Sequence, residues 1–268
     1  MVKVNAVIMA GHGKDSRPLI DGVDKVFLEY NGKTLVEHVA EALRCSENVL
    51  DFRIVGPRNM LEKKLHERYG IVDEVGTFVE NALVGYNSME PNGKYTLFIF
   101  GDIPYVRSEA IDYVLRQIPL DGKVDVYLPV CMREKCLRKD LIYGPYMVLE
   151  DGNYRTANMA IVDVKKASSA AYLFDNGFKL RRLSEWNLGT FVTLFEIFRE
   201  VGFRDAFNIG LRYFSRRLFN TRTGLRLIDI KDTLQRKFAL NFDFIVTPYV
   251  DTVVDIDTCK QYSSLIGK

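Results

Sequence analysis

Three aspartates are placed in the sequence where their carboxylates could do chemistry. Asp102 follows an apolar run over residues 95–100, and Asp255 and Asp257 alternate around Ile256 after another apolar pair. Residues i and i+2 of a strand point the same way, so we expect Asp255 and Asp257 to face one site. Carboxylates that meet phosphates at strand ends are suited to hold Mg²⁺, which prefers oxygen ligands. The alternative is that each aspartate caps a turn or a helix, as Asp257 could before the last helix.

A second candidate is the loop that follows the apolar stretch at residues 6–10. This stretch reads as a short buried strand, and the loop after it is rich in glycine and charge. Small residues let a backbone approach a ligand closely, and the free N–H groups of such a turn suit an anion. We interpret the loop as one that holds nucleotide phosphates. The residues concerned are Ala10, Gly11, His12 and Gly13, with Arg17 and Lys25 as cations.

The loop does not match the two best-known phosphate-binding patterns. No Gly-Lys-Ser/Thr follows at the spacing of a Walker A loop. The dinucleotide fingerprint is incomplete, and the second strand ends in Gly56-Pro57 without an acidic residue for a ribose. An ordinary surface turn is the remaining alternative.

The elements around these residues alternate between strand and helix in the first half of the chain. Thr34 and Glu37 form a capping-box pattern for a helix over residues 34–44. We expect strands at 26–30, 52–56, 71–75, 95–100 and 124–130, and further helices at 60–69, 78–89 and 108–117. This alternation predicts an α/β, Rossmann-like fold with a mostly parallel central sheet flanked by helices. Ligands of such sheets bind at the carboxyl ends of strands, where Gly11 and Asp102 fall.

The second half departs from this rhythm. Residues 143–149 and 160–164 predict strands that extend the sheet in antiparallel fashion, and residues 243–247 predict a further strand before a closing helix at 259–266. Residues 165–240 read as a mainly helical, basic insertion or lid, although a solvated helix face over a hydrophobic stripe is the simpler explanation of the charge. We expect residues 1–268 to form a single domain with this insertion before the last strand.

Composition excludes several classes of protein. Of the 268 residues, 47% are hydrophobic, so a sizeable core is expected, and the net charge of +2 gives no sign of a nucleic-acid partner. No signal-peptide core and no apolar run of transmembrane length is present, so we expect a cytoplasmic protein. The four cysteines and three histidines lack zinc-site spacing, and we expect reduced, mostly buried thiols.

Taken together, the motifs resemble the MobA-like nucleotidyltransferases, a branch of the GT-A-like α/β superfamily. The opening strand runs into Met9-Ala10-Gly11-His12-Gly13, then Ser16-Arg17, then Lys25, and Gly101-Asp102-Ile103-Pro104 and Asp255-Ile256-Asp257-Thr258 follow in the family's order. The resemblance covers residues 1–130 and 240–268. His12 replaces the second glycine of the usual pair, and residues 165–240 have no counterpart in the smallest relatives.

The resemblance implies transfer of a nucleoside monophosphate from an NTP to a phosphorylated small molecule, with release of pyrophosphate. Catalysis of this kind is mostly positioning and charge neutralisation. Arg17 and Lys25 would neutralise the phosphates, and Asp102 and Asp257, supported by Asp255, would hold Mg²⁺. The resemblance also implies that Asn81 contacts the base or the ribose of the nucleotide. Asn158 is a candidate for contact with the acceptor, and either asparagine could instead be structural.

Two other classes of function remain open at this stage. A GT-A glycosyltransferase would use Asp-x-Asp to hold a nucleotide-sugar and would make no pyrophosphate. A non-catalytic nucleotide-binding regulator would bind without turnover, and His12 and the basic helical region keep it in consideration. The sequence leaves open the base, the acceptor and the oligomeric state, with a homodimer as one option.

Overall fold

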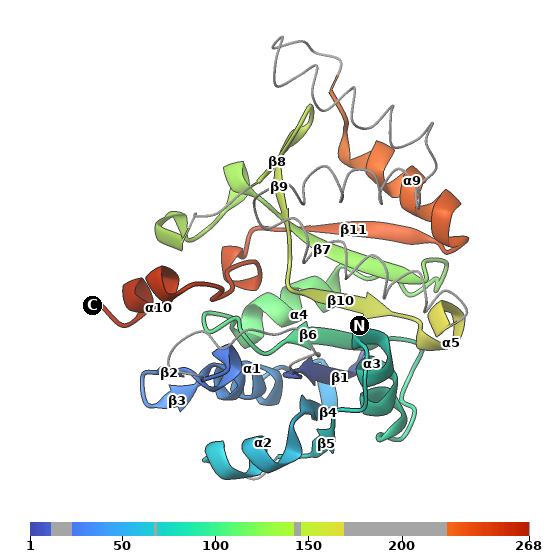
Figure 1. Cartoon of the computed structure of the whole chain (residues 1–268). Coiled ribbons are helices and arrows are strands. Elements are labelled where there is room, and N and C mark those ends of the chain that lie inside the picture. Colours follow the sequence, from blue (N-terminus) through green and yellow to red (C-terminus); the bar gives the residue numbers. More distant parts are fainter. Residues whose placement is uncertain (12–22, 67–68, 142–145, 169–223, 268) are drawn as a thin grey trace.

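A computed structural model describes residues 1–11, 23–66, 69–141, 146–168 and 224–267. Within these residues a nine-stranded sheet runs in the order β5-β4-β1-β6-β10-β7-β9-β8, and β11 pairs with β7 (Figure 1). The strands are β1 (Val4–Met9), β4 (Val49–Gly56), β5 (Ile71–Asp73), β6 (Thr96–Phe100), β7 (Val126–Met132), β8 (Met147–Leu149), β9 (Gly152–Thr156), β10 (Met159–Val162) and β11 (Phe242–Thr247). A separate hairpin joins β2 (Glu29–Tyr30) to β3 (Lys33–Thr34).

The sheet is mostly parallel, as the sequence predicts. Strands β5, β4, β1 and β6 pair in parallel, and so do β7 and β11. Strand β10 is antiparallel to both β6 and β7, and β9 is antiparallel to both β7 and β8. Only β9 and β10 therefore run against the common direction among these nine strands, and the carboxyl ends of the others lie along one edge.

Strands β9 and β10 pair with successive parts of the same side of β7. The first part of β7 pairs with β10, and the part from Val130 to Met132 pairs with β9. Between the two strands the chain leaves the ladder at Ala157 and Asn158. Asn158 accepts a hydrogen bond from the N–H of Phe100 at the end of β6 (3.0 Å) and donates one to the carbonyl of Thr252 (2.9 Å). The crossing thus ties β6 to the segment after β11.

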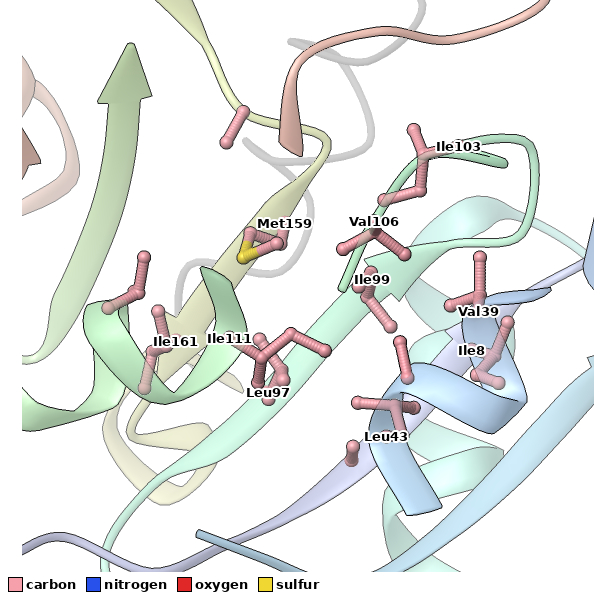
Figure 2. Close-up of a cluster of buried hydrophobic side chains, with 14 of the residues drawn as sticks. Ile8, Val39, Leu43, Leu97, Ile99, Ile103, Val106, Ile111, Met159 and Ile161 are labelled. Carbon is pink, nitrogen blue, oxygen red and sulfur yellow. The ribbon is translucent and has the colours of Figure 1, made fainter. Parts of the chain in front are cut away.

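Helices cover both faces of the sheet because the strands are apolar on both sides, as buried parallel strands require. On one face the buried cluster joins β1, β6 and β10 to helices α1 (Leu35–Arg44) and α4 (Ser108–Arg116), and Figure 2 shows Ile8, Leu97 and Ile99 against Val39, Leu43 and Ile111. On the other face Val7, Val55 and Phe98 pack against α3 (Phe78–Asn87). Helix α9 (Leu227–Phe238) packs against β7 and β11.

The remaining helices are short and lie near the ends of strands. They are α2 (Arg58–Lys64), α5 (Val164–Ala167) and α10 (Cys259–Leu265), with 3₁₀ turns η1 (Lys25–Phe27), η2 (Arg133–Lys135), η3 (Lys139–Leu141) and η5 (Val250–Thr252). In the part of the chain covered by the structure, no helix is long and apolar enough to cross a membrane.

Several local expectations are confirmed and others need correction. The capping box of Thr34 and Glu37 begins α1 as predicted. The strand expected at residues 26–30 is wrong, because η1 occupies residues 25–27 and only residues 29–30 pair. Helix α2 spans 58–64 rather than beginning at residue 60. Residues 253–257 lie outside any strand, and Thr258, not Asp257, caps α10 by accepting from the N–H of Gln261. Most of the predicted insertion, residues 169–223, lies outside the described residues.

The contact between α3 and the sheet depends on Gly85. A Cβ at this position would lie 2.6 Å from Val7 Cγ1 and 2.7 Å from Val55 Cγ2. Replacing an exposed helical glycine by alanine usually stabilises a helix by about 1 kcal/mol. We predict that Gly85→Ala instead destabilises the protein by about 1–3 kcal/mol, because the helix must move off the sheet. Urea unfolding measures the change, and Asn87→Ala, an exposed site on α3, is the control that should be neutral or stabilising. A stabilising Gly85→Ala would contradict the packing.

Candidate active site

The ammonium group of Lys25 lies between two of the three predicted carboxylates. Lys25 Nζ forms an ion pair with Asp102 Oδ2 and a second with Asp257 Oδ1 at 2.7 Å. Asp102 follows β6, and Asp257 precedes α10. The two segments are joined directly by a hydrogen bond from the N–H of Ile256 to the carbonyl of Asp102 (3.2 Å). Residues far apart in the sequence thus meet at the carboxyl edge of the sheet.

Two opposing effects act on the protonation of Lys25. Burial alone would lower its pKa, since it disfavours the charged form. The charges and hydrogen bonds of Asp102 and Asp257 outweigh burial and raise the pKa of Lys25 above its ordinary value. Lys25 is therefore a fixed cation, with a side chain still 37% exposed on the solvent side. A cation of this kind is suited to meet a phosphate.

Asp255 is held differently from its neighbour Asp257. Its side chain is buried and accepts a hydrogen bond at 2.8 Å from Arg155 Nη2, which comes from β9. Burial raises the pKa of Asp255 to about 6, the charges of Asp257 and Asp102 act in the same direction, and Arg155 and Lys25 oppose them. All three aspartates are thus close enough to influence one another, although residues 253–257 do not form the strand on which that expectation rested.

A second group of residues surrounds Gly11 at the end of β1. A Cβ on Gly11 would lie 2.6 Å from Glu74 Oε2 and 3.3 Å from Asn81 Nδ2, so only glycine fits without a shift of these side chains. Asn81 is buried, and its Oδ1 accepts from the N–H groups of Val75 (2.7 Å) and Gly76 (3.2 Å). Asn81 therefore shapes the loop between β5 and α3 and brings Glu74 over Gly11.

The oxygen chemistry of the site fits a divalent cation. Asp102 Oδ1 is buried and has no hydrogen-bond partner within the described part of the chain, while Asp102 Oδ2 and Asp257 both contact a cation, Lys25. Carboxylate oxygens with spare acceptor capacity are the ligands that Mg²⁺ prefers. As the described side chains stand, no group of three or more His, Cys, Asp or Glu residues is arranged around a metal position, because Lys25 lies between the carboxylates.

The predicted residues divide into three sets. The structure brings Lys25, Asp102, Asp255 and Asp257 together at one edge, with Asn158 at the nearby crossing between β9 and β10. It places Ala10, Gly11 and Asn81 together at the end of β1, where Ala10 is buried and donates its N–H to the carbonyl of Val55 (2.8 Å). His12, Gly13 and Arg17 lie outside the described residues.

Sequence reasoning missed two charged residues of the site. The sequence predicts Glu74 inside an edge strand at 71–75, but β5 ends at Asp73 and Glu74 directly follows it. The correct strand end was the signal that would have marked Glu74 as a candidate. Arg155 carried no such signal, because its partner Asp255 lies 100 positions further along the chain.

The raised pKa of Asp255 predicts a pH dependence of stability. A carboxylate with a pKa of about 6 in the folded state and about 3.9 unfolded binds its proton more tightly when folded, so its contribution to stability falls as pH rises through this window. Asp255→Asn removes this loss and keeps an acceptor for Arg155. We predict that the unfolding free energy of the variant, minus that of the unchanged protein, rises by roughly 1–3 kcal/mol from pH 4 to pH 7.5.

Chemical denaturation at a series of pH values measures this difference. Carboxylates with lowered pKa values, such as Glu37 and Asp112, titrate in both proteins and cancel in the comparison. A difference that does not change with pH would contradict the burial of a charged Asp255.

Comparison with known proteins agrees with this geometry. A family profile described as a MobA-like NTP transferase domain matches residues 6–139, which is 134 of the 268 residues. A probable molybdenum cofactor guanylyltransferase from Thermococcus gammatolerans is 25% identical over 125 residues, which cover 45% of this chain and 59% of that protein. The chain therefore spans somewhat over half the length of this curated relative.

Solved structures show the same fold over almost the whole chain. A hypothetical transferase from Thermus thermophilus superimposes with a TM-score of 0.71 at 21% identity, covering 97% of this chain and 100% of that one. The 4-diphosphocytidyl-2C-methyl-D-erythritol synthase from Anaerococcus prevotii gives 0.56 at 11% identity, covering 99% and 95%. At these identities the likeness concerns the fold alone. The family match, the order of its motifs and the shared fold agree, and the chain belongs to the MobA-like NTP transferase family.

Proposed function

We propose that this protein transfers a nucleoside monophosphate from an NTP to a phosphorylated small molecule and releases pyrophosphate. The observation that carries the proposal is the cluster of Lys25, Asp102 and Asp257 at the carboxyl edge of the sheet, beside Gly11, in a chain of this family. The cluster offers a cation for phosphate oxygens and carboxylates for a metal, the two requirements of phosphoryl-group chemistry.

The charge balance of the cluster supports a cationic partner. Among the described residues, the carboxylates of Asp102, Asp255 and Asp257 lie with two cations, Lys25 and Arg155. If Lys25 turns toward a phosphate, the Asp102 and Asp257 oxygens that it now contacts can meet a metal ion instead. Asp102 and Asp257 would then hold Mg²⁺, with Asp255 in support. When bound, this ion would neutralise charge on the phosphate oxygens.

The residues around the transferred group need not include a general base. A phosphate acceptor is already ionised at neutral pH and is a nucleophile as it stands. In our proposal Lys25, together with Arg17 of the glycine-rich loop, stabilises the charge of the departing pyrophosphate. Asn158 lies where the chain crosses from β9 to β10, next to the end of β6, and would meet the acceptor from that side. Ala10, Gly11, His12 and Gly13 would carry the nucleotide, with Asn81 shaping its base pocket.

The base that we propose is guanine, with Glu74 as its reader. The Glu74 carboxylate lies over Gly11, where the nucleotide is expected, and a carboxylate can accept two hydrogen bonds side by side. Guanine is the common base that offers two adjacent donors, N1–H and the N2 amino group, on one edge. The curated relative from Thermococcus is named as a guanylyltransferase, which supports the same choice.

Pyrophosphate release is the direct test of the transfer reaction. The protein is incubated with each of the four NTPs, Mg²⁺ and pooled phosphorylated metabolites. We expect release with one NTP and one acceptor pool, and a loss of at least about 10²-fold in Asp102→Asn, which keeps the side-chain shape but not the charge. NTP binding is followed separately by calorimetry. Binding without release from any pool would favour a regulatory protein, and transfer of a sugar without pyrophosphate would indicate a glycosyltransferase.

Base choice is tested by Glu74→Gln, since the amide offers one acceptor and one donor in place of two acceptors. We predict that the preference for GTP over the other NTPs, measured as the ratio of kcat/KM values, falls by about 10–100-fold, equal to roughly 1–3 kcal/mol. Glu80→Gln, an exposed glutamate in the first turn of α3, is the matched control and should leave the ratio unchanged. If the GTP preference of Glu74→Gln equals that of the unchanged protein, Glu74 does not recognise the base. The proposal of the transfer reaction itself would still stand.

A further inference from the structure

Two of the four cysteines face each other inside the fold. Cys131, in β7, and Cys136, directly after η2, are buried, and their Sγ atoms are 3.0 Å apart. Cys45 and Cys259 are exposed instead, so the expectation of mostly buried thiols holds for this pair only. Neither buried thiol has a part in the proposed transfer reaction.

The backbone between the two cysteines holds them in this arrangement. The turn η2 reverses the chain, and the N–H of Cys136 donates to the carbonyl of Arg133 (3.4 Å). Glu134, within this turn, accepts hydrogen bonds from the N–H and the side-chain amide of Asn153 on β9. A disulfide has an S–S distance of about 2.05 Å, so the sulfurs need to approach by only about 1 Å.

We propose that Cys131 and Cys136 form a reversible intramolecular disulfide on oxidation. The co-reactant is a small peroxide, since a bulky oxidant would not reach the sulfurs of residues that are 0% and 5% exposed. Cys136, the more accessible of the two, reacts first.

The chemistry balances in two steps. The Cys136 thiolate attacks one oxygen of hydrogen peroxide, the O–O bond breaks, and a sulfenic acid and hydroxide form. The thiolate of Cys131 then attacks the sulfur of the sulfenic acid, the S–O bond breaks, and the second oxygen leaves as hydroxide. The two thiol protons complete two water molecules, so two thiols and one peroxide give one disulfide and two waters.

Burial controls the rate of this reaction. It raises the pKa of the Cys131 thiol, and the neighbouring Cys136 and Asp251 act in the same direction while Arg155 opposes them. The Cys131 thiolate, which closes the disulfide in the second step, is therefore scarce at neutral pH, and this step is expected to be slow.

The position of the pair gives its oxidation a consequence for the candidate site. Cys131 is paired with Arg155 in the ladder between β7 and β9, and Arg155 holds Asp255. A disulfide that pulls Cys131 toward η2 would shift the backbone pair of Cys131 and Arg155. The shift would move the Arg155 guanidinium relative to Asp255. This consequence rests on the proposed function, whereas the disulfide itself does not.

The test uses the full chain with Cys45→Ser and Cys259→Ser, which removes the two exposed thiols and prevents links between molecules. The folded protein is treated with hydrogen peroxide, then unfolded and alkylated with N-ethylmaleimide, and the intact mass is measured. We expect alkylation to fall from two groups to none with a mass loss of about 2 Da, both reversed by dithiothreitol. In a matched variant that adds Cys136→Ser, the remaining thiol cannot form this bond.

The outcomes separate the disulfide from the transfer reaction. Two alkylated thiols after peroxide treatment, or sulfinic acid without the loss of about 2 Da, would overturn the proposal. If the disulfide forms, pyrophosphate release is compared before and after oxidation, and we expect a several-fold fall in kcat that dithiothreitol restores. An oxidised protein with unchanged kcat would overturn the link to Arg155 while leaving the disulfide in place. The mass readout stands even if no transfer activity is found.

Discussion

The arrangement of the candidate site depends on the ion pairs that Lys25 makes with Asp102 and Asp257. Carboxylates at such short range repel one another, and burial makes the repulsion stronger because little water screens it. An ammonium group between Asp102 and Asp257, and a guanidinium on Asp255, make their close approach tolerable. Burial is the largest cause of the raised pKa of Asp255, and the charges of Asp257 and Asp102 act in the same direction. A site of this composition is suited to an additional positive charge, as our proposal of a metal-bound nucleotide requires.

The sheet supplies the geometry that this charge cluster needs. Parallel strands deliver Gly11 and Asp102 to one edge, and the reversed strands β9 and β10 bring Arg155 and Asn158 to the same edge from the other direction. Successive side chains of a strand point to opposite faces, so each strand packs into the core on both faces while the residues at its end line the site. The fold thus separates stability, which lies in the packed faces, from chemistry, which lies at the strand ends.

Much of this could be predicted from the sequence because the signals were local. The capping box at Thr34 and Glu37, the apolar strands and the aspartate after β6 each lie within a few residues of their cause. Pairings set by tertiary structure could not be predicted in this way. Arg155 meets Asp255 only because β9 pairs with β7. The turn η1 at residues 25–27 replaces the start of the predicted strand at the point where Lys25 contacts Asp102 and Asp257. Glu74 was missed because the predicted strand ran through it to residue 75, and nothing local separated it from a surface glutamate.

The distance along the chain between the partners of the central ion pair has a consequence for how the protein reaches its working state. Lys25 and Asp257 are 232 positions apart, so their contact closes a loop that contains most of the chain. Closing so long a loop costs conformational entropy, which only the completed sheet can offset. We therefore expect the cluster to assemble last during folding and to come apart first when the segment after β11 loosens. Nucleotide affinity would then fall when the segment after β11 detaches from the sheet. Ligand binding would therefore report the fraction of molecules in which this segment is docked.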